Sequence, residues 1–200
     1  MRYLIGIDEA GRGPLAGPVA VGAVIVTRDF DLSIIEGVRD SKQLTPVARE
    51  EWYGRLRAMK REGALDFAVS FSSAAVIDRR GIVFAIRSAL ARCLMRLAAR
   101  PEECEILLDG SLRAPDIFTH QKTIIRGDES EPLISLASVA AKVRRDALMR
   151  QLARTYPAYH FDVHKGYGTL AHRRAISREG LSALHRATFC KRLRLPSNSV

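Results

Sequence analysis

The chain has 200 residues, of which 47% are hydrophobic, and a formal net charge of +10. This length and composition suffice for one buried core, which favours a single domain. No apolar stretch is long enough to span a membrane and no signal-peptide pattern opens the chain, so we expect a cytoplasmic protein. The three cysteines form no close pair, which argues against a zinc site or a disulfide framework.

The positive charge is concentrated in the last third of the chain. Residues 1–141 contain 19 Lys plus Arg against 19 Asp plus Glu, whereas residues 142–200 contain 13 against 3. An excess of this size in one segment favours a polyanionic partner. Aromatic residues alternate with the basic ones and no lipid-facing apolar stripe accompanies them, so nucleic acid fits better than a membrane surface.

An acidic pair followed by a glycine-rich segment lies near the start. The apolar run 3–7 predicts a buried strand that ends at Asp8 and Glu9, and Gly11, Arg12 and Gly13 follow. Buried carboxylates are costly unless they are paired or hold a metal ion. Glycines let the backbone approach a ligand closely, and a guanidinium offers a planar fork of donors. Together these residues indicate phosphodiester chemistry.

The glycines also resemble a dinucleotide-binding fingerprint. That fingerprint requires a helix directly after the glycines. Here Pro14 and Pro18 lead instead into the β-rich apolar run 19–26. The segment is therefore interpreted as a strand, a glycine loop and a second strand.

The remainder of the chain alternates helices and strands. Thr45 is the expected N-cap of the first helix, and Pro101 follows the end of another. Mixed elements in this order indicate an α/β domain. The expected helices are 46–62, 73–78, 82–99 and 132–155, and the further strands are 65–72, 104–108 and 122–126.

Acidic residues recur where strands are expected to end. Asp109 follows the strand 104–108 and Asp128 follows the strand 122–126, as Asp8 and Glu9 follow the first strand. Ligands of α/β sheets gather at such edges, so we expect these four carboxylates to converge. Oxygen ligands suit Mg²⁺ or Mn²⁺, and two such ions can clamp both oxygens of an in-line phosphoryl displacement.

Several ordered blocks of sequence resemble bacterial ribonuclease HII. They span roughly residues 3–185 and are Gly6–Val19, Asp40–Leu44, Leu108–Gly110, Gly127–Asp128, Ile134–Asp146 and His164–Thr169. The resemblance implies a ribonuclease-H-like mixed sheet flanked by helices. It also implies a catalytic domain over residues 1–155, with a small, basic helical C-terminal region over residues 156–200 packed on the same domain.

The resemblance also assigns site residues. The family's metal-binding and catalytic acids fall on Asp8, Glu9, Asp109 and Asp128. Its substrate-binding residues fall on a glycine-arginine-glycine loop that recognises the ribose 2′-hydroxyl, on a tyrosine that stacks on the sugar, and on lysines that hold phosphates: Gly11, Arg12, Gly13, Tyr167, Lys42 and Lys165.

Lys142 is a further candidate for the substrate site. It lies one helical turn after Ser138 on the same face of the long helix. It either contacts the substrate or the site acids, or it belongs to a helix that only packs in the core. Asp146 is expected to pair with neighbouring arginines, and His120, His160 and His185 are expected at the surface or as helix caps.

The activity implied by the resemblance is endonucleolytic. It is cleavage of the RNA strand of RNA–DNA hybrids, and of the 5′ side of ribonucleotides embedded in duplex DNA, by two-metal hydrolysis with Mn²⁺ or Mg²⁺ that leaves 3′-hydroxyl and 5′-phosphate ends. We expect a monomer, and binding to a sliding clamp is left open. Two alternatives fit the sequence less well. A noncatalytic hybrid-binding module needs no strand-end acids, and a Holliday-junction resolvase leaves the glycine loop and Tyr167 without a role.

Overall fold

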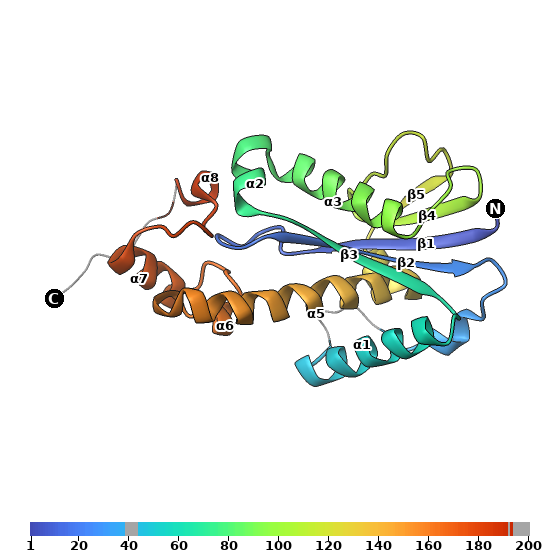
Figure 1. The fold of residues 1–200 in the computed structure, drawn as a ribbon, viewed down its shortest axis with the longest axis horizontal. Coiled ribbons are helices and arrows are strands. Elements are labelled where there is room, and N and C mark those ends of the chain that lie inside the picture. Colours follow the sequence, from blue (N-terminus) through green and yellow to red (C-terminus); the bar gives the residue numbers. More distant parts are fainter. Residues whose placement is uncertain (39–43, 192, 194–200) are drawn as a thin grey trace.

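The structure is a computed structural model that describes residues 1–38, 44–191 and 193, so Lys42 lies outside the described residues. A mixed sheet forms the middle layer, with helices on both faces (Figure 1). The five strands follow the spatial order β3-β2-β1-β4-β5. Their bounds are β1 Tyr3–Ala10, β2 Val19–Thr27, β3 Asp66–Ser72, β4 Cys104–Asp109 and β5 Gln121–Ile124.

The sheet divides into an antiparallel and a parallel half. Strand β1 pairs antiparallel with β2, and β2 pairs antiparallel with β3. On its other side β1 pairs parallel with β4, and β4 pairs parallel with β5. The ends of β1 and β4 therefore meet at one edge of the sheet, where the register places Ile7 opposite Leu108.

Each face of the sheet is covered by a pair of helices. Ile5 and Ile7 of β1 join the core under α2, Ala74–Arg80, and α3, Ile82–Arg96. Val24 and Val26 of β2 join the opposite core, under α1, Pro46–Arg61, and α5, Pro132–Thr155. Successive side chains of a strand point to opposite faces of the sheet, so these continuous apolar strands supply residues to both cores.

Helix α5 lies unusually close to the sheet. A Cβ atom on Gly22 would lie 2.3 Å from the carbonyl oxygen of Ala137, so only glycine fits at that point of β2. The facing part of the helix is rich in buried alanine and serine, including Ser135 and Ser138. Small residues on both sides bring the helix backbone against β1 and β2, beside Asp8.

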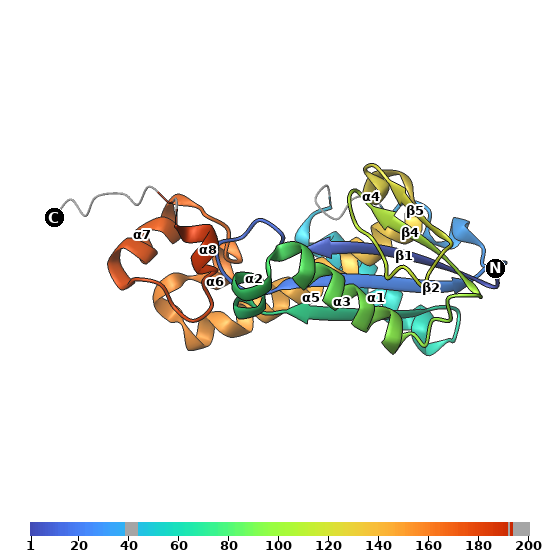
Figure 2. The same ribbon diagram turned by 90° about the horizontal axis from the view of Figure 1, so that it is seen from above.

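The C-terminal helices lie at the end of the molecule opposite the N-terminus (Figure 2). The first two of them pack on the part of α5 that extends beyond the sheet, in a cluster that includes Met149, Phe161 and Ala175. Ala16, from the segment between β1 and β2, belongs to the same cluster. These elements are α6 Phe161–His164, α7 Leu170–Glu179 and α8 Ala187–Cys190, with 3-10 turns at Pro157–Tyr159 and, earlier, Leu32–Ile35.

Most of the expected elements are present, with altered ends. Thr45 accepts a hydrogen bond from the Ala48 amide as the N-cap of α1. The helix expected over 82–99 ends at Arg96, and the strand expected over 122–126 is β5, Gln121–Ile124. A short helix that was not expected, α4, covers Gly127–Ser130. None of the helices in the described ranges combines the length and apolarity that a membrane crossing requires.

Candidate active site

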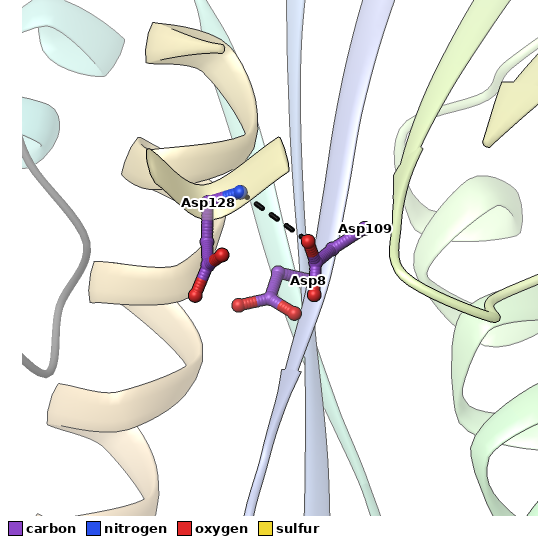
Figure 3. Close-up of side chains that lie close together, drawn as sticks. All are labelled: Asp8, Asp109 and Asp128. Atoms are coloured by element: carbon purple, nitrogen blue, oxygen red, sulfur yellow. Dashed lines mark hydrogen bonds between the residues drawn. The ribbon is translucent and has the colours of Figure 1, made fainter. Parts of the chain in front are cut away.

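Three carboxylates meet at the edge of the sheet where β1 and β4 end. Asp8, Asp109 and Asp128 each place a carboxylate oxygen within 4.8 Å of the others (Figure 3). We call this group the acid cluster. Asp8 and Asp128 are almost completely buried, with 3% and 4% of their surface exposed.

Each member reaches the cluster by a different route. Asp8 lies inside β1 rather than after it, and Asp109 is the last residue of the parallel neighbour β4. Asp128 does not lie at a strand end as expected, because β5 stops at Ile124 and the chain turns through Arg126, whose φ of 52° is left-handed, into α4. The Asp128 amide then donates a hydrogen bond to Asp109 Oδ1 at 3.3 Å.

The electrostatics of Asp8 are those of an unbalanced anionic site. Burial raises the pKa of Asp8 well above its ordinary value, and the nearby carboxylates of Glu9 and Asp109 raise it further. A hydrogen bond with the Ser138 side chain and one from the Glu9 amide, at 2.7 Å, lower this pKa in part. Neutralising the cluster requires protons or a cation. A donor set made only of oxygens suits a hard divalent ion.

Glu9 differs from the other three predicted acids in its surroundings. Neighbouring residues of a strand point to opposite faces, and Asp8 faces α5 through Ser138. The Glu9 carboxylate accepts a hydrogen bond from Arg12 Nη1 at 3.1 Å. The same nitrogen of Arg12 lies 3.3 Å from Ser111 Oγ, just beyond β4. Three of the four predicted acids thus form the cluster, and Glu9 connects it to the glycine loop.

Two buried arginines bind backbone carbonyl oxygens of the loop over residues 11–18, between β1 and β2. The guanidinium of Arg186 donates to the carbonyl oxygens of Gly11 at 2.7 Å, Arg12 at 2.8 Å and Gly17 at 3.0 Å. Arg145 donates to two more carbonyls of this segment, those of Ala16 at 3.4 Å and Pro18 at 2.9 Å. We call these two side chains the arginine clamp.

The clamp explains why the loop requires glycine at its first position. Gly11 has a φ of 87°, and a Cβ there would lie 1.9 Å from Arg145 Nε. Gly13 differs, because a Cβ at that position would meet no atom within 4 Å. Packing inside the protein therefore accounts for Gly11, whereas the space at Gly13 is open to a ligand.

The clamp also corrects the expectation that the basic residues of 142–200, Arg145 and Arg186 included, form a surface for a polyanionic partner. Arg145 and Arg186 are both completely buried, and no described carboxylate forms a salt bridge with either. Burial lowers the pKa of Arg186 to about 9, so it still has a positive charge at neutral pH. Among the described residues of the region, the exposed basic ones are Arg144, Arg150, Arg154, Arg173, Arg174, Arg178 and Lys191.

Tyr167 lies beside the loop among cationic side chains. It is 42% exposed, and its ring centroid lies 5.9 Å from both Lys142 Nζ and Arg145 Cζ. Lys142 Nζ lies 3.0 Å from Asp146 Oδ1, so Asp146 pairs with this lysine rather than with the arginines expected.

Lys165 is half-buried, and its ammonium group donates to the Asp162 carbonyl oxygen. Burial lowers the pKa of Lys165, while the nearby Asp146 carboxylate opposes that shift.

Sequence reasoning missed several residues that shape the site. The sequence alone does not distinguish the arginines of the clamp from surface charge, and it marks Ser138 only by its spacing from Lys142. His185, expected at the surface or as a helix cap, is buried, with 5% exposed, whereas His120 and His160 are exposed. A basic residue inside an otherwise apolar helix face was the available signal for Arg145, which lies between Ala141 and Met149 on α5.

Comparison with known proteins identifies the family of this chain. The family model described as ribonuclease HII matches residues 5–193. The chain belongs to the ribonuclease HII family. Its ribonuclease HII relative from Chlorobaculum parvum is 46% identical over 185 residues, which are 92% of this chain and 87% of the relative. The chain is thus an endonuclease of the ribonuclease H type and a metal-dependent hydrolase.

Solved structures of ribonucleases H share the fold. The ribonuclease HII of a complex with PCNA from Archaeoglobus fulgidus has a TM-score of 0.75 and 24% identity, over 98% of each chain. Bst-RNase HIII, solved in complex with Mn²⁺, has a TM-score of 0.63 and 21% identity, over 94% of this chain and 64% of that one. The expected mixed sheet flanked by helices is confirmed.

Proposed function

We propose that this ribonuclease HII cleaves the RNA strand of RNA–DNA hybrids, and the 5′ side of ribonucleotides embedded in duplex DNA, leaving 3′-hydroxyl and 5′-phosphate ends. The observation that supports it best is the acid cluster beside a glycine loop that is fixed by buried arginines. An anionic cluster alone repels phosphate, so a noncatalytic binding module would gain nothing from it. A divalent cation reverses that repulsion.

Asp8, Glu9, Asp109 and Asp128 are the proposed catalytic acids and metal ligands. The cluster fits a divalent cation because its three carboxylates each place an oxygen within 4.8 Å of the others, and because burial and the nearby carboxylates of Glu9 and Asp109 raise the pKa of Asp8. Two ions, Mg²⁺ or Mn²⁺, would stabilise the attacking and leaving oxygens of an in-line displacement when bound. The role of Ser138 and of the Glu9 amide is to orient Asp8 by hydrogen bonds.

The loop is the proposed site for the ribose 2′-hydroxyl. Gly11, Arg12 and Gly13 lie directly after the acids, and the open space at Gly13 allows a sugar to approach the backbone. Arg12 is 44% exposed at its side chain, although one nitrogen is engaged by Glu9. The 2′-hydroxyl distinguishes RNA from DNA, so contacts here would select a ribonucleotide.

Tyr167 is proposed to stack on the sugar next to the cleaved bond. Its exposed ring and its position beside the loop support this role. Lys142, which faces the ring, and Lys165, which lies near Lys142, are proposed to hold phosphates, as is Lys42, which lies outside the described residues. Phosphate contacts supply affinity and orientation, whereas the loop and Tyr167 supply the choice of bond.

The proposed organisation is a catalytic domain over residues 1–155 with a basic helical region over residues 156–200 packed on it. We infer that the enzyme acts as a monomer in the cytoplasm, where its cysteines, all free in the described structure, stay reduced. A sliding clamp is included as a partner to test, because the Archaeoglobus fulgidus relative forms a complex with PCNA.

The deciding experiment compares three duplexes: all DNA, DNA with one ribonucleotide, and a long RNA–DNA hybrid. We expect cleavage of the last two only, with a metal requirement met by Mn²⁺ or Mg²⁺, and a 5′-phosphate on the downstream product. Cleavage of a four-way DNA junction, or binding without cleavage in the presence of either metal, would contradict the proposal.

A Tyr167→Ala variant tests how the ribose is recognised. The loss of stacking should reduce cleavage at a single embedded ribonucleotide by about 10-fold to 100-fold, because misplacement of the reacting bond is costly. Duplex affinity should change little, because phosphate contacts dominate it. Unchanged turnover on all ribose-containing substrates would exclude a role for the ring.

A further inference from the structure

Three buried histidines form a cluster behind Tyr167. His172 is completely buried, and His164 and His185 are 8% and 5% exposed. The rings of His164 and His172 stack with centroids 4.3 Å apart, and the edge of Phe161 closes the cluster at 5.5 Å from His172. The proposed catalytic steps do not use these side chains, so their arrangement needs another explanation.

Two of the histidines form a continuous chain of hydrogen bonds that ends at Tyr167. The Ser182 amide donates to His185 Nδ1 at 2.9 Å. The Nε2 atoms of His185 and His172 lie 3.0 Å apart, and His172 Nδ1 lies 2.9 Å from the Tyr167 carbonyl oxygen. The chain connects the segment before α8 to the residue proposed to stack on the ribose.

The backbone groups at the two ends of this chain determine which atom donates in each of its three hydrogen bonds. A carbonyl oxygen only accepts, so His172 Nδ1 is protonated and donates a hydrogen bond to the Tyr167 carbonyl oxygen. An amide only donates, so His185 Nδ1 is the acceptor and its proton is on Nε2. His185 Nε2 therefore donates to His172 Nε2. The chain is complete only when both rings are neutral, and burial lowers the pKa of both, that of His172 to about 4.

These hydrogen bonds argue against a metal site at the cluster. His164 Nε2 donates to the Tyr159 carbonyl oxygen at 2.7 Å, because its Nδ1 accepts from the Gly166 amide at 3.2 Å. The ring nitrogens of all three histidines thus have partners within the protein. Among the described residues, the only group with the spacing of a metal site is the acid cluster.

The same segment also holds the glycine loop. Arg186, the neighbour of His185, is the member of the arginine clamp that binds the carbonyls of Gly11, Arg12 and Gly17. Its backbone amide donates to the Leu15 carbonyl oxygen at 2.7 Å. Residues 185 and 186 therefore contact both sides of the proposed ribose site, the loop through Arg186 and Tyr167 through His185 and His172.

We propose that His172 and His185 are positioning residues that set the place of Tyr167 relative to the glycine loop, and so determine how accurately the enzyme engages a single ribonucleotide. The proposal rests on the proposed function, because it assigns the histidines an effect only through Tyr167. It predicts that substitution of either histidine lowers kcat more than it lowers the affinity for substrate.

The test compares variants that keep or remove one hydrogen bond. His172→Asn keeps an N–H donor near the position of Nδ1, whereas His172→Phe removes it. We expect His172→Phe to lower kcat at a single embedded ribonucleotide by about 10-fold or more with little change in KM, and His172→Asn to recover most of that loss. Equal losses in both variants would overturn the proposal. His160→Asn, an exposed histidine of the same region, is the matched control and should leave kcat unchanged.

A second pair covers the case in which His172→Phe does not fold. The amide of His185→Gln can reach the position of Nε2 and donate to His172, but the shorter amide of His185→Asn cannot. We expect the His185→Gln variant to retain its kcat for cleavage at a single embedded ribonucleotide, and the His185→Asn variant to have a lower kcat. Thermal unfolding of both variants checks that they fold. The reverse order would contradict the proposal.

A double-mutant cycle separates positioning from general damage. In a Tyr167→Ala background, His172→Phe should reduce kcat no further, because the ring that it positions is absent. An undiminished effect in that background would overturn the proposal while leaving the proposed function intact. If Tyr167→Ala alone keeps full activity, the stacking role fails, and the positioning role fails with it.

Discussion

The acid cluster and the arginine clamp are adjacent, but they solve the problem of buried charge in opposite ways. In the cluster, Asp8 faces other carboxylates, and its raised pKa reports that the anionic form is unfavourable there. In the clamp, Arg186 is equally buried, but three backbone carbonyls satisfy its guanidinium. A ligand is needed to balance the charge of the first region, whereas in the second the chain itself satisfies Arg186. The loop is therefore held in place before substrate arrives, whereas the charge of the acid cluster is balanced only when a proton or a cation binds.

Removing one carboxylate should distinguish the acid cluster from the arginine clamp most clearly, because activity should fall while stability should not. Asp109→Asn deletes a charge with little change of shape, so we expect cleavage to fall by more than the roughly 10²-fold to 10⁴-fold typical of one general acid or base. Metal-free thermal stability should not fall, because the change relieves repulsion with Asp8. Turnover with Mn²⁺ and unfolding in chelator are the two measurements.

The control for that variant is Asp116→Asn. Asp116 is exposed and pairs only with Arg113 on the surface. It should change neither turnover nor stability measurably, since exposed ion pairs contribute little. If Asp109→Asn kept near-normal turnover, Asp109 would not be a metal ligand.

Substitution of an arginine of the clamp should lower the stability of the protein as well as its activity. Arg186→Ala leaves three carbonyls of the loop without their donor, and we expect a loss of about 3 kcal/mol in the free energy of unfolding. Arg178→Ala, an exposed arginine of the same region, should change it by less than about 0.5 kcal/mol. Chemical denaturation measures both. Equal stability of the two variants would show that the carbonyl contacts of Arg186 contribute nothing net.

The pH dependence of stability should reveal the buried histidine. Burial lowers the pKa of His172 to about 4 from an ordinary 6.5, so the unfolded chain binds the proton first as pH falls. The stabilising contribution is therefore complete above pH 6.5 and is lost as pH falls towards 4. Relative to His172→Asn, the wild-type chain should lose on the order of 3 kcal/mol over this range. A constant difference between the two proteins would mean that His172 titrates normally.

The smallest expected effect concerns the cations near Tyr167. Lys165→Gln removes one proposed phosphate contact, so the slope of log affinity against log salt should become shallower by about 0.9. Arg113→Gln, an exposed arginine after β4, is the control and should leave the slope unchanged. Titrations of a catalytically inactive variant at several salt concentrations provide the slopes. An unchanged slope for Lys165→Gln would place this lysine away from the substrate.

Much of the fold was predictable from local pattern. Continuous apolar runs over 3–7 and 19–26 predicted β1 and β2, and Thr45 with Pro46 marked the start of α1. Asp8 and Asp109 were predictable because each follows an apolar run, and parallel pairing then brings them together. Asp128 was predicted for the cluster by the wrong route, because a left-handed Arg126 and a four-residue helix leave no periodicity to detect.

The sequence by itself determined the chemical character of this protein: oxygen ligands, a glycine loop with an arginine, and an excess of positive charge towards the C-terminus. Tertiary structure decided which of those charges are available to a ligand. Arg145 and Arg178 look alike in the sequence, yet one is buried under the loop and the other is exposed. The fate of a charged side chain depends on contacts between residues far apart in the chain, as Arg186 shows with Gly11, and local sequence does not contain that information.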